Sequence, residues 1–324
     1  MTSYYAALAL TVLAGPGMRL RQLSAAAAAL LFVWMVTAPV ARVRDRGDGR
    51  LHVSMIDVGQ GDALLVTFPN GRRLAVDAGG TASRGGFDVG ERVVGPALRA
   101  RGILTLDYVA VTHGDPDHAG GALALVRDFA PREVWWGVPV PGHEPTTRLR
   151  AEADRQRAGW RTLQRGDRLD LGEVALRVHH PPAPDWERRR VRNDDSLVLE
   201  LAWRDVSVLL TGDIGREVEL ALLASLDLRP RVILKVGHHG SATSSTPAFI
   251  NHVRPLVALI GAGRANPYGH PVPAVLDRLH EVGTRVFRTD LEGQIDVVTD
   301  GHEIRVGTFT GTRLLVKSEP RRHE

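Results

Sequence analysis

The chain contains no cysteine among its 324 residues, and this absence limits how it can hold a metal ion. Neither a disulfide nor a thiolate ligand can form, so any bound metal must rest on histidine and carboxylate side chains. Lysine is scarce as well, because Lys235 and Lys317 are two of the 41 basic residues and the other 39 are arginine. We attribute that preference to the composition of the genome and draw no function from it.

Most of the chain also lacks net charge. The formal charge of +4 arises before residue 51, where six arginines face two aspartates, and the remainder carries 35 basic and 35 acidic residues. The high isoelectric point therefore does not indicate a general nucleic-acid-binding face. A local exception is segment 186–193, whose four arginines could either hold phosphate groups or form a solvated loop.

Aromatic residues are few, at 5% of the chain. A platform on which nucleic-acid bases stack needs such rings, and the clustered candidates are Trp135, Trp136, Trp160 and Trp186. Tryptophan more often fills a core, so these residues do not by themselves indicate a binding surface.

The first fifty residues stand apart, because segments 1–18 and 22–41 carry no charge. A helix of about 20 residues rises about 30 Å, enough to cross the hydrocarbon core of a bilayer. We predict membrane segments within residues 1–50, with a transmembrane helix over 22–41. A signal peptide is the alternative, but its positive region, Arg19 and Arg21, would begin late, and Pro39-Val40-Ala41 is a poor cleavage site.

From residue 51 onward, short apolar strands alternate with helical patterns. This alternation favours an α/β fold in which two sheets pack together between helices, over residues 51–310, followed by a tail at 311–324. Strands are predicted at Leu51–Asp57, Asp62–Phe68, Arg73–Asp77, Tyr108–Thr112, Glu133–Trp136, Arg161–Thr162, Val174–His179, Leu197–Ala202, Val206–Thr211, Val232–Val236, Val257–Ile260, Arg285–Arg288 and Gln294–Thr299. Helices are predicted at Val89–Ala100, Gly120–Phe129, Thr147–Ala158, Arg216–Ser225, Ser245–Val253 and Pro273–Val282.

The loop after the strand at Tyr108 is rich in potential metal ligands. His113, Asp115, Asp117 and His118 fall within six residues. Several like and unlike charges on one tight loop are costly to bring together unless a cation neutralises the carboxylates. The loop therefore indicates a metal site rather than a solvated acidic turn.

Other strands also end in polar groups. Asp77, Asp213 and the pair His238-His239 follow three predicted strands, and His270 lies in a loop rich in proline and glycine. Because α/β folds collect functional groups at the carboxyl ends of their strands, we expect these side chains to meet near the metal loop.

These residues resemble a known family. The loop reads His-x-Asp-x-Asp-His, a variant of the His-x-His-x-Asp-His motif of the metallo-β-lactamase fold. Together with residues 55–63, 193–199 and His238-His239-Gly240-Ser241, it is similar to the C-terminal domain of ComEC proteins, the membrane channels that import single-stranded DNA in natural competence. The resemblance extends over residues 51–309 and implies a metallo-β-lactamase αββα sandwich preceded by membrane helices.

The resemblance implies a centre of two divalent ions, with Asp213 bridging them and Asp117 and Asp213 as the catalytic carboxylates. Imidazole and carboxylate ligands suit Zn²⁺ or Mn²⁺, and the aspartate at position 115 favours Mn²⁺. Of the histidine pair we favour His239, because adjacent residues at a strand end point in opposite directions. The predicted ligands are His113, Asp115, Asp117, His118, Asp213, His239 and His270.

Further residues are predicted to support the site. Asp57, Asp62 and Asp77 are expected to orient ligands rather than to bind metal. Candidates to contact a substrate phosphate, or to cap turns around the site, are Asn193, Ser196, Lys235 and Ser241, with His238 beside them. His179 and His180 end a strand too, but a metal role for them is the less favoured interpretation.

The implied function is hydrolysis of a phosphodiester in single-stranded DNA, by a hydroxide held between two metal ions. Two alternatives remain: a metallohydrolase of a phosphocholine ester or lactone, and a non-catalytic membrane accessory of a DNA channel. Because the chain resembles only a part of ComEC, three interpretations stay open: a truncated gene product, a fragment of a longer protein, or a partner of a separate channel subunit. The arginine count on either side of 22–41 favours a cytoplasmic catalytic domain, whereas the family placement, which we prefer, indicates the outer face of the cell membrane.

Overall fold

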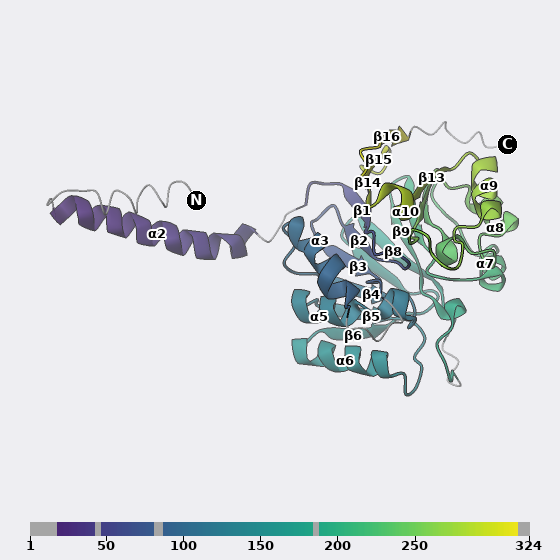
Figure 1. Cartoon of the computed structure of the whole chain (residues 1–324), viewed down its shortest axis with the longest axis horizontal. Coiled ribbons are helices and arrows are strands. Elements are labelled where there is room, and N and C mark those ends of the chain that lie inside the picture. Colours follow the sequence, from purple (N-terminus) through teal and green to yellow (C-terminus); the bar gives the residue numbers. More distant parts are fainter. Residues whose placement is uncertain (1–17, 43–46, 81–86, 184–187, 317–324) are drawn as a thin grey trace. The chain divides into compact units, whose positions relative to one another are not determined.

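The computed structural model describes residues 18–42, 47–80, 87–183 and 188–316 (Figure 1). The chain divides into two compact units, residues 1–46 and 47–324, so the boundary falls after Arg46 rather than after residue 50. The first unit contains helix α2 (Met18–Arg42), which confirms that residues 22–41 are helical. In the described part of the chain, no helix reaches the length and apolarity needed to span a bilayer. The predicted membrane crossing stays a prediction, and the uncharged run 1–17 lies outside the described residues.

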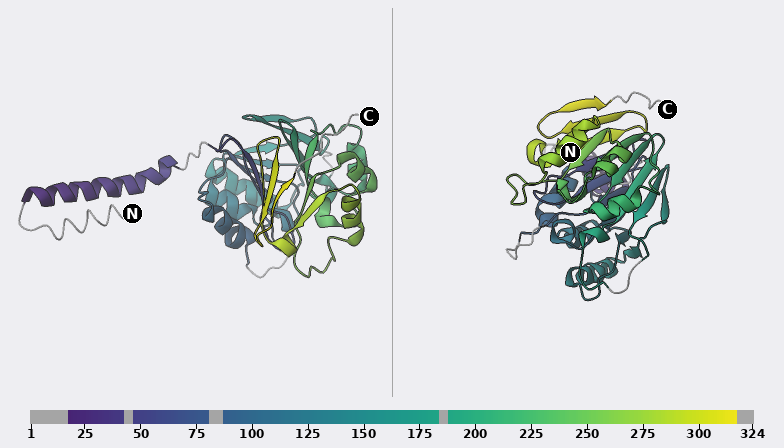
Figure 2. Two further views of the ribbon diagram at one scale, coloured as in Figure 1. Left: turned by 90° about the horizontal axis from the view of Figure 1, so that it is seen from above. Right: turned by 90° about the vertical axis from the view of Figure 1, so that its right-hand side faces the viewer.

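The second unit contains two sheets (Figure 2). In the described residues the larger sheet has nine strands in the order β16-β15-β14-β1-β2-β3-β4-β5-β6, and the smaller has seven in the order β13-β12-β11-β10-β9-β8-β7. The strands are β1 (Leu51–Met55), β2 (Leu64–Thr67), β3 (Arg73–Val76), β4 (Tyr108–Val111), β5 (Glu133–Trp136), β6 (Gly159–Thr162), β7 (Arg168–Leu171), β8 (Val174–His180), β9 (Val198–Trp203), β10 (Val206–Leu210), β11 (Arg231–Lys235), β12 (Val257–Ile260), β13 (Arg285–Arg288), β14 (Ile295–Thr299), β15 (Ile304–Thr308) and β16 (Arg313–Val316).

Helices cover the outer face of each sheet, which gives the predicted αββα sandwich. One layer lies against the nine-stranded sheet and the other against the seven-stranded sheet (Figure 1). The first layer comprises a π-helical turn (Gly90–Val94) with α3 (Gly95–Ala100), α4 (Pro116–Ala119), α5 (Ala122–Phe129) and α6 (Glu144–Gln156). The second comprises α7 (Arg216–Leu222), α8 (Pro247–Val253) and α9 (Pro273–Glu281), and a short α10 (Thr289–Glu292) follows β13.

The direction of the strands decides where functional groups can gather. Strands β3 to β6 run parallel in one sheet, and β10 to β13 run parallel in the other. Strands β10 and β12 are buried along their whole length, as expected of parallel strands covered on both faces. The loops that follow β4, β10, β11 and β12 therefore leave the carboxyl ends of parallel strands, where α/β folds place their sites.

All thirteen predicted strands and six predicted helices are present, and β5, β12 and β13 have the predicted ends while the ends of the others are shifted. Three strands of the described chain were not predicted, namely β7, β15 and β16. Each is short, and β7 and β16 carry exposed arginines and alternate weakly between buried and exposed positions. Because Arg313–Val316 pairs with β15, the residues expected to form a tail contribute an edge strand, and the boundary predicted at residue 310 is wrong.

The core between the sheets depends on large buried rings. Trp135 is fully buried, and its ring stacks on Tyr108 with centroids 4.5 Å apart. We expect Trp135→Ala to lower the free energy of unfolding by about 3–5 kcal/mol, because the cavity cannot be filled by neighbouring strands. Denaturant titration measures this value. Trp160→Ala removes a half-buried ring and is the matched control; an equal loss in both variants would contradict this description of the core.

The buried carboxylate of Glu200, within β9, makes a pH-dependent contribution to the stability of the fold. Burial raises the pKa of Glu200, but hydrogen bonds from His179 and Ser207 outweigh it, so the net pKa lies below its usual range. The ionised form therefore stabilises the fold above about pH 4.3, the pKa of the unfolded chain, and this contribution is lost as the pH falls through the folded pKa.

We expect Glu200→Gln to be less stable than the wild type by about 1–3 kcal/mol at pH 7. The deficit should shrink below about pH 4.3. Unfolding by urea at pH 7 and at acid pH checks this, with the exposed Glu303→Gln as control. A deficit that stays constant across this range would show that the charge of Glu200 contributes nothing.

Candidate metal centre

The loop after β4 folds into helix α4, and this local structure separates its four potential ligands. Asp115 precedes the helix with extended backbone, and its carbonyl accepts hydrogen bonds from the backbone N–H groups of His118 and Ala119 at 3.0 and 2.8 Å. His118 is thereby buried, whereas the carboxylates of Asp115 and Asp117 are 39% and 34% exposed. The motif thus supplies one buried imidazole and two partly exposed carboxylates from one turn.

Two glycines allow this loop to pack against neighbouring backbone. A Cβ on Gly80 would lie 2.0 Å from the carbonyl oxygen of Pro116, and a Cβ on Gly61 would lie 2.4 Å from that of Asp117. Both glycines also have positive φ, at +153° and +135°. The glycine-rich segments that follow β1 and β3 therefore serve close backbone approach to the metal loop.

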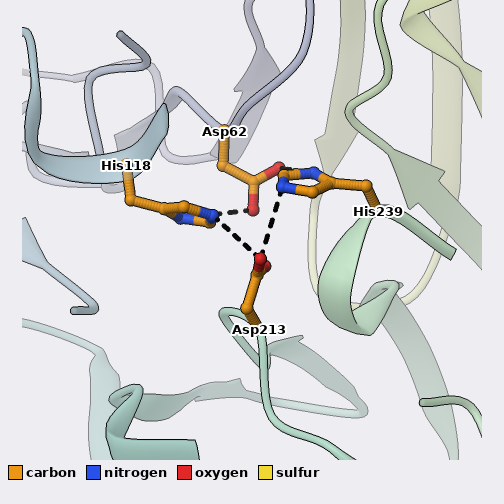
Figure 3. Close-up of side chains that lie close together, drawn as sticks. All are labelled: Asp62, His118, Asp213 and His239. Atoms are coloured by element: carbon orange, nitrogen blue, oxygen red, sulfur yellow. Dashed lines mark ion pairs between the residues drawn. The ribbon is translucent and has the colours of Figure 1, made fainter. Parts of the chain in front are cut away.

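Four buried side chains meet at the carboxyl ends of the strands (Figure 3). In Asp62, His118, Asp213 and His239, one potential ligand atom each lies within 4.8 Å of the others. Asp213 Oδ2 is the common neighbour, at 3.2 Å from His118 Nε2 and 3.4 Å from His239 Nε2. The segment between β1 and β2 and the loops after β4, β10 and β11 thus bring two imidazoles and two carboxylates to one point.

Each imidazole is oriented through its other nitrogen. His118 Nδ1 lies 2.8 Å from Asp77 Oδ2, and His239 Nδ1 lies 2.9 Å from the carbonyl oxygen of Gly261. Both partners only accept hydrogen bonds, so Nδ1 carries the proton and Nε2 turns inward. Asp77 is itself fixed by the backbone N–H and hydroxyl of Thr112, at 2.7 and 2.8 Å.

The inward nitrogens fit a metal ion. His113 Nε2, His118 Nε2 and His239 Nε2 are buried and have no hydrogen-bond partner in the described chain. A buried nitrogen without a hydrogen bond is costly, whereas a lone pair facing a carboxylate oxygen is the arrangement of a metal ligand. The four-residue group is therefore suited to a divalent cation.

The charges of the group support the same conclusion. Burial lowers the pKa of His118, but Asp213 and Asp77 raise it to a net value well above the usual range. Burial likewise lowers the pKa of His239, and Asp213 and Asp62 raise it well above that range. Burial raises the pKa of Asp213, yet the two imidazoles bring it well below its usual range. A divalent ion bound by these two imidazoles would supply positive charge beside the buried carboxylates.

Lys235 supplies a further balancing charge from the end of β11. Its side chain is 1% exposed, and Nζ contacts the Asp62 carboxylate, Asp213 Oδ1 at 3.3 Å and the carbonyl oxygen of Gly212 at 2.8 Å. Burial raises the pKa of Asp62, but Lys235 and His239 bring it down to about 2. Because these contacts occupy its three protons, Lys235 holds the carboxylates in place and does not face a substrate surface.

The other predicted ligands surround this group at larger separation. The rings of His113 and His118 lie 4.3 Å apart, and His113 Nε2 faces Asp115 Oδ2 at 3.4 Å. Asp117 Oδ2 lies 3.3 Å from His239 Nε2. His270 is not part of the four-residue group. Its ring centroid lies 5.7 Å from that of His238.

The predicted supporting residues occupy two kinds of position. Asn193 Nδ2 lies 3.1 Å from His238 Nε2, and Ser196 Oγ accepts from the backbone N–H of Asp213 at 3.0 Å while lying 3.2 Å from His113 Nδ1. Ser241 contacts Thr243 rather than the centre, at 3.0 Å between hydroxyl oxygens. Asp57 accepts from the backbone N–H of Gly59, so it caps a turn.

The structure also places the neighbouring histidines and arginines. His179 and His180 contact Glu200 and the carbonyl oxygen of Ser196 respectively, and neither joins the group. In the arginine-rich segment, Arg188 and Arg192 form ion pairs with Asp195 at 3.0 Å. These two guanidinium groups therefore fix the loop before β9, and Trp186 lies outside the described residues.

Sequence reasoning missed the arginines closest to the centre. A cavity of about 440 Å³ is lined by Asp213 and His238 together with Arg216, Arg278 and Thr243. Arg216 begins α7 and Arg278 lies on α9, in separate stretches of ordinary helical sequence. No local pattern distinguishes such residues from exposed helix charges, so only the tertiary structure reveals them.

The chain belongs to the metallo-beta-lactamase superfamily, which matches residues 56–264. That superfamily is one of metal-dependent hydrolases, and the four-residue group lies where its fold collects polar strand ends. The ComEC resemblance predicted from the motifs is confirmed by three curated relatives.

The first relative is ComE operon protein 3 of Bacillus subtilis, 35% identical over 268 residues, or 80% of this chain and 34% of the relative. Recombination protein 2 of Haemophilus influenzae is 32% identical over 248 residues, 76% of this chain and 28% of the relative. Competence protein ComA of Neisseria gonorrhoeae is 31% identical over 245 residues, 75% of this chain and 31% of the relative. The chain spans about a third of the length of these relatives.

The orientation of His118 gives a test of the centre. We expect Asp77→Asn to weaken Mn²⁺ or Zn²⁺ binding by about 10- to 100-fold, because the inward nitrogen loses its fixed tautomer and direction. Metal titration calorimetry on the folded chain measures the change. Asp205→Asn is the matched control, since Asp205 precedes β10 and pairs with Arg231 at the opposite end of that strand. Equal affinities for all three proteins would contradict the assignment of Asp77.

Proposed function

We propose that this chain is a membrane-associated metallohydrolase that cleaves phosphodiester bonds in single-stranded DNA during uptake. The observation that carries the proposal is the buried group of Asp62, His118, Asp213 and His239, with inward nitrogens that lack hydrogen bonds. The competence relatives support DNA as the substrate class.

Two divalent ions, Mn²⁺ or Zn²⁺, would be held by the loop histidines and aspartates, with Asp213 between them. Such ions supply a nucleophilic hydroxide at neutral pH and stabilise the charge that develops on the phosphate. His118 and His239 present Nε2 to the same carboxylate oxygen of Asp213, so this residue is best placed to be shared. Lys235 keeps its other oxygen engaged and fixes the carboxylate plane.

Asp117 is the carboxylate with access to both the centre and solvent. Burial raises its pKa, but the hydrogen bond with His239 and the charge of His118 lower it to a net value below the usual range. It is therefore ionised at neutral pH and able to accept a proton at Oδ2. This position suits a group that orients a water molecule or receives a proton during hydrolysis.

The cavity beside Asp213 offers two arginines to an anionic substrate, beside the carboxylates of Asp194, Asp213 and Glu217. Arg216, Arg278 and Asn193 line it, and guanidinium groups bind phosphate oxygens in a planar, charge-assisted geometry. Asp194 lines it as well, but its Oδ1 accepts from the backbone N–H of Gly215 at 2.7 Å. A phosphodiester bound at the centre would lie beside the cavity that holds these arginine and asparagine donors.

The same proposal places the catalytic unit at the outer face of the cell membrane, beside a separate channel subunit. Leu23, Leu30 and Trp34 of α2 are exposed apolar residues, which supports association with a lipid surface. The predicted membrane segments in residues 1–50 would hold the hydrolase where incoming DNA is single-stranded.

Hydrolysis of a labelled single-stranded oligonucleotide by the full chain tests the proposal. Cleavage should require Mn²⁺ or Zn²⁺, stop with EDTA, and fall by more than about a hundredfold in Asp213→Asn. Asp205→Asn should retain wild-type activity. If wild-type protein with bound metal leaves DNA intact but hydrolyses a small phosphoester, the substrate assignment is wrong; if it hydrolyses neither, a non-catalytic role follows.

A further inference from the structure

Exposed aromatic side chains are rare in the hydrolase unit. Among its described residues, Phe87, Tyr268 and Phe309 are the mostly exposed ones, at 51%, 66% and 84%. The tryptophans that the sequence suggested do not form a surface platform. Trp135 and Trp136 are buried, and Trp160 is half-buried against Trp136. Two of the three exposed rings lie on loops that border predicted ligands, because Phe87 lines a cavity with Asp115 and Tyr268 stacks on His270.

Tyr268 lies over His270 in the loop after β12. The two rings are nearly parallel, with centroids 5.7 Å apart and planes at 26°. Asn266 fixes the loop, since its side-chain oxygen accepts from the backbone N–H of His270 at 3.0 Å and its amide donates to the carbonyl of the same residue at 2.6 Å. The ring of Tyr268 is therefore presented to solvent from a fixed turn.

Phe87 lines a cavity of about 480 Å³ that begins at the metal loop itself. Asp115 and Pro116 form one side, and His143 and Leu149 form another. The size is that of a small-molecule site, for which about 300–1,000 Å³ is usual. A Cβ on Gly114 would lie 2.8 Å from the His143 ring. The side of the cavity that His143 forms therefore packs directly on the metal loop.

A series of neighbouring rings connects the two aromatic residues through the centre. Ring centroids lie 4.3 Å apart from His113 to His118, 5.2 Å from His118 to His239 and 6.3 Å from His239 to His238. The series continues at 5.7 Å to His270 and again at 5.7 Å to Tyr268. At its other end His113 faces Asp115, which borders the cavity of Phe87. The series thus leads from Tyr268 to the metal loop, and that loop also borders the cavity of Phe87.

An unpaired DNA strand crossing the site offers a base on each side of the phosphate held at the centre. Bases of any sequence stack on aromatic rings, whereas the bases of a duplex are already stacked on one another. We propose that Phe87, within its cavity, and Tyr268 stack on bases of single-stranded DNA on the two sides of the scissile phosphate. This inference deepens the proposed function and rests on it for the position of the phosphate.

Binding of two labelled strands by the full chain tests the inference. One is an oligothymidine of about ten nucleotides, and the other is an abasic deoxyribose-phosphate chain of equal length. Fluorescence anisotropy in EDTA keeps both strands intact and removes metal from the comparison. The wild type should prefer the thymidine strand by tenfold or more, and Phe87→Ala and Tyr268→Ala should each reduce this preference by about fivefold or more.

Matched variants separate stacking from other effects. Tyr268→Phe keeps a ring and should retain the preference, and Phe309→Ala removes an exposed ring that borders neither site. Equal or undetectable binding of both strands by the wild type, or a preference that survives both alanine substitutions, overturns the inference. If the wild type prefers the thymidine strand but cleaves neither strand with Mn²⁺ or Zn²⁺ bound, hydrolysis is contradicted and base stacking is not.

Discussion

Two carboxylates that lie almost fully buried, Asp62 and Asp213, impose the constraint on which the site depends. Burying an ionised carboxylate is costly unless opposite charge lies beside it. Lys235 supplies one such charge from the end of β11, and His118 and His239 supply the rest by holding protons or a metal ion. One of the chain's two lysines thus lies inside its metal centre.

The fold meets this constraint by placing each charged group at a strand end. Parallel strands β4, β10 and β11 deliver His118, Asp213 and Lys235 from two different sheets, and the sandwich brings those edges together. Glycines at positions 61 and 80 let the metal loop approach the turns after β1 and β3 more closely than any side chain would permit. Backbone geometry, burial and charge therefore act on the same few residues.

Much of the architecture could be predicted from the sequence because hydrophobic periodicity is local. The thirteen predicted strands and the αββα arrangement follow from apolar runs and from the resemblance of the motifs. The edge strands β7 and β16 escaped, since a short exposed strand has little hydrophobic signal and is defined by its partner. The short strand β15, which pairs with β16, escaped with it. The end of the domain was misplaced for the same reason.

The site was less predictable where a residue's role depends on what lies across the sandwich. The strand-end positions of His118, Asp213 and His239 were visible in the motifs, and the structure brings these three together. Asp62 was expected only to orient a ligand, yet it lies among them, because its distance from Lys235 and His239 is set by tertiary packing. For the arginines of 188–192 the sequence left phosphate binding and a solvated loop open, because it could not show that Asp195 would pair with two of them.

Anomalous diffraction from crystals of the full chain grown with Mn²⁺ tests the central claim most directly. An anomalous peak should lie within coordination distance of His118 Nε2, His239 Nε2 and Asp213 Oδ2, with Lys235 still paired to the remaining oxygen of Asp213. A bound ion elsewhere in the molecule, with no peak between these imidazoles and Asp213, would contradict the account.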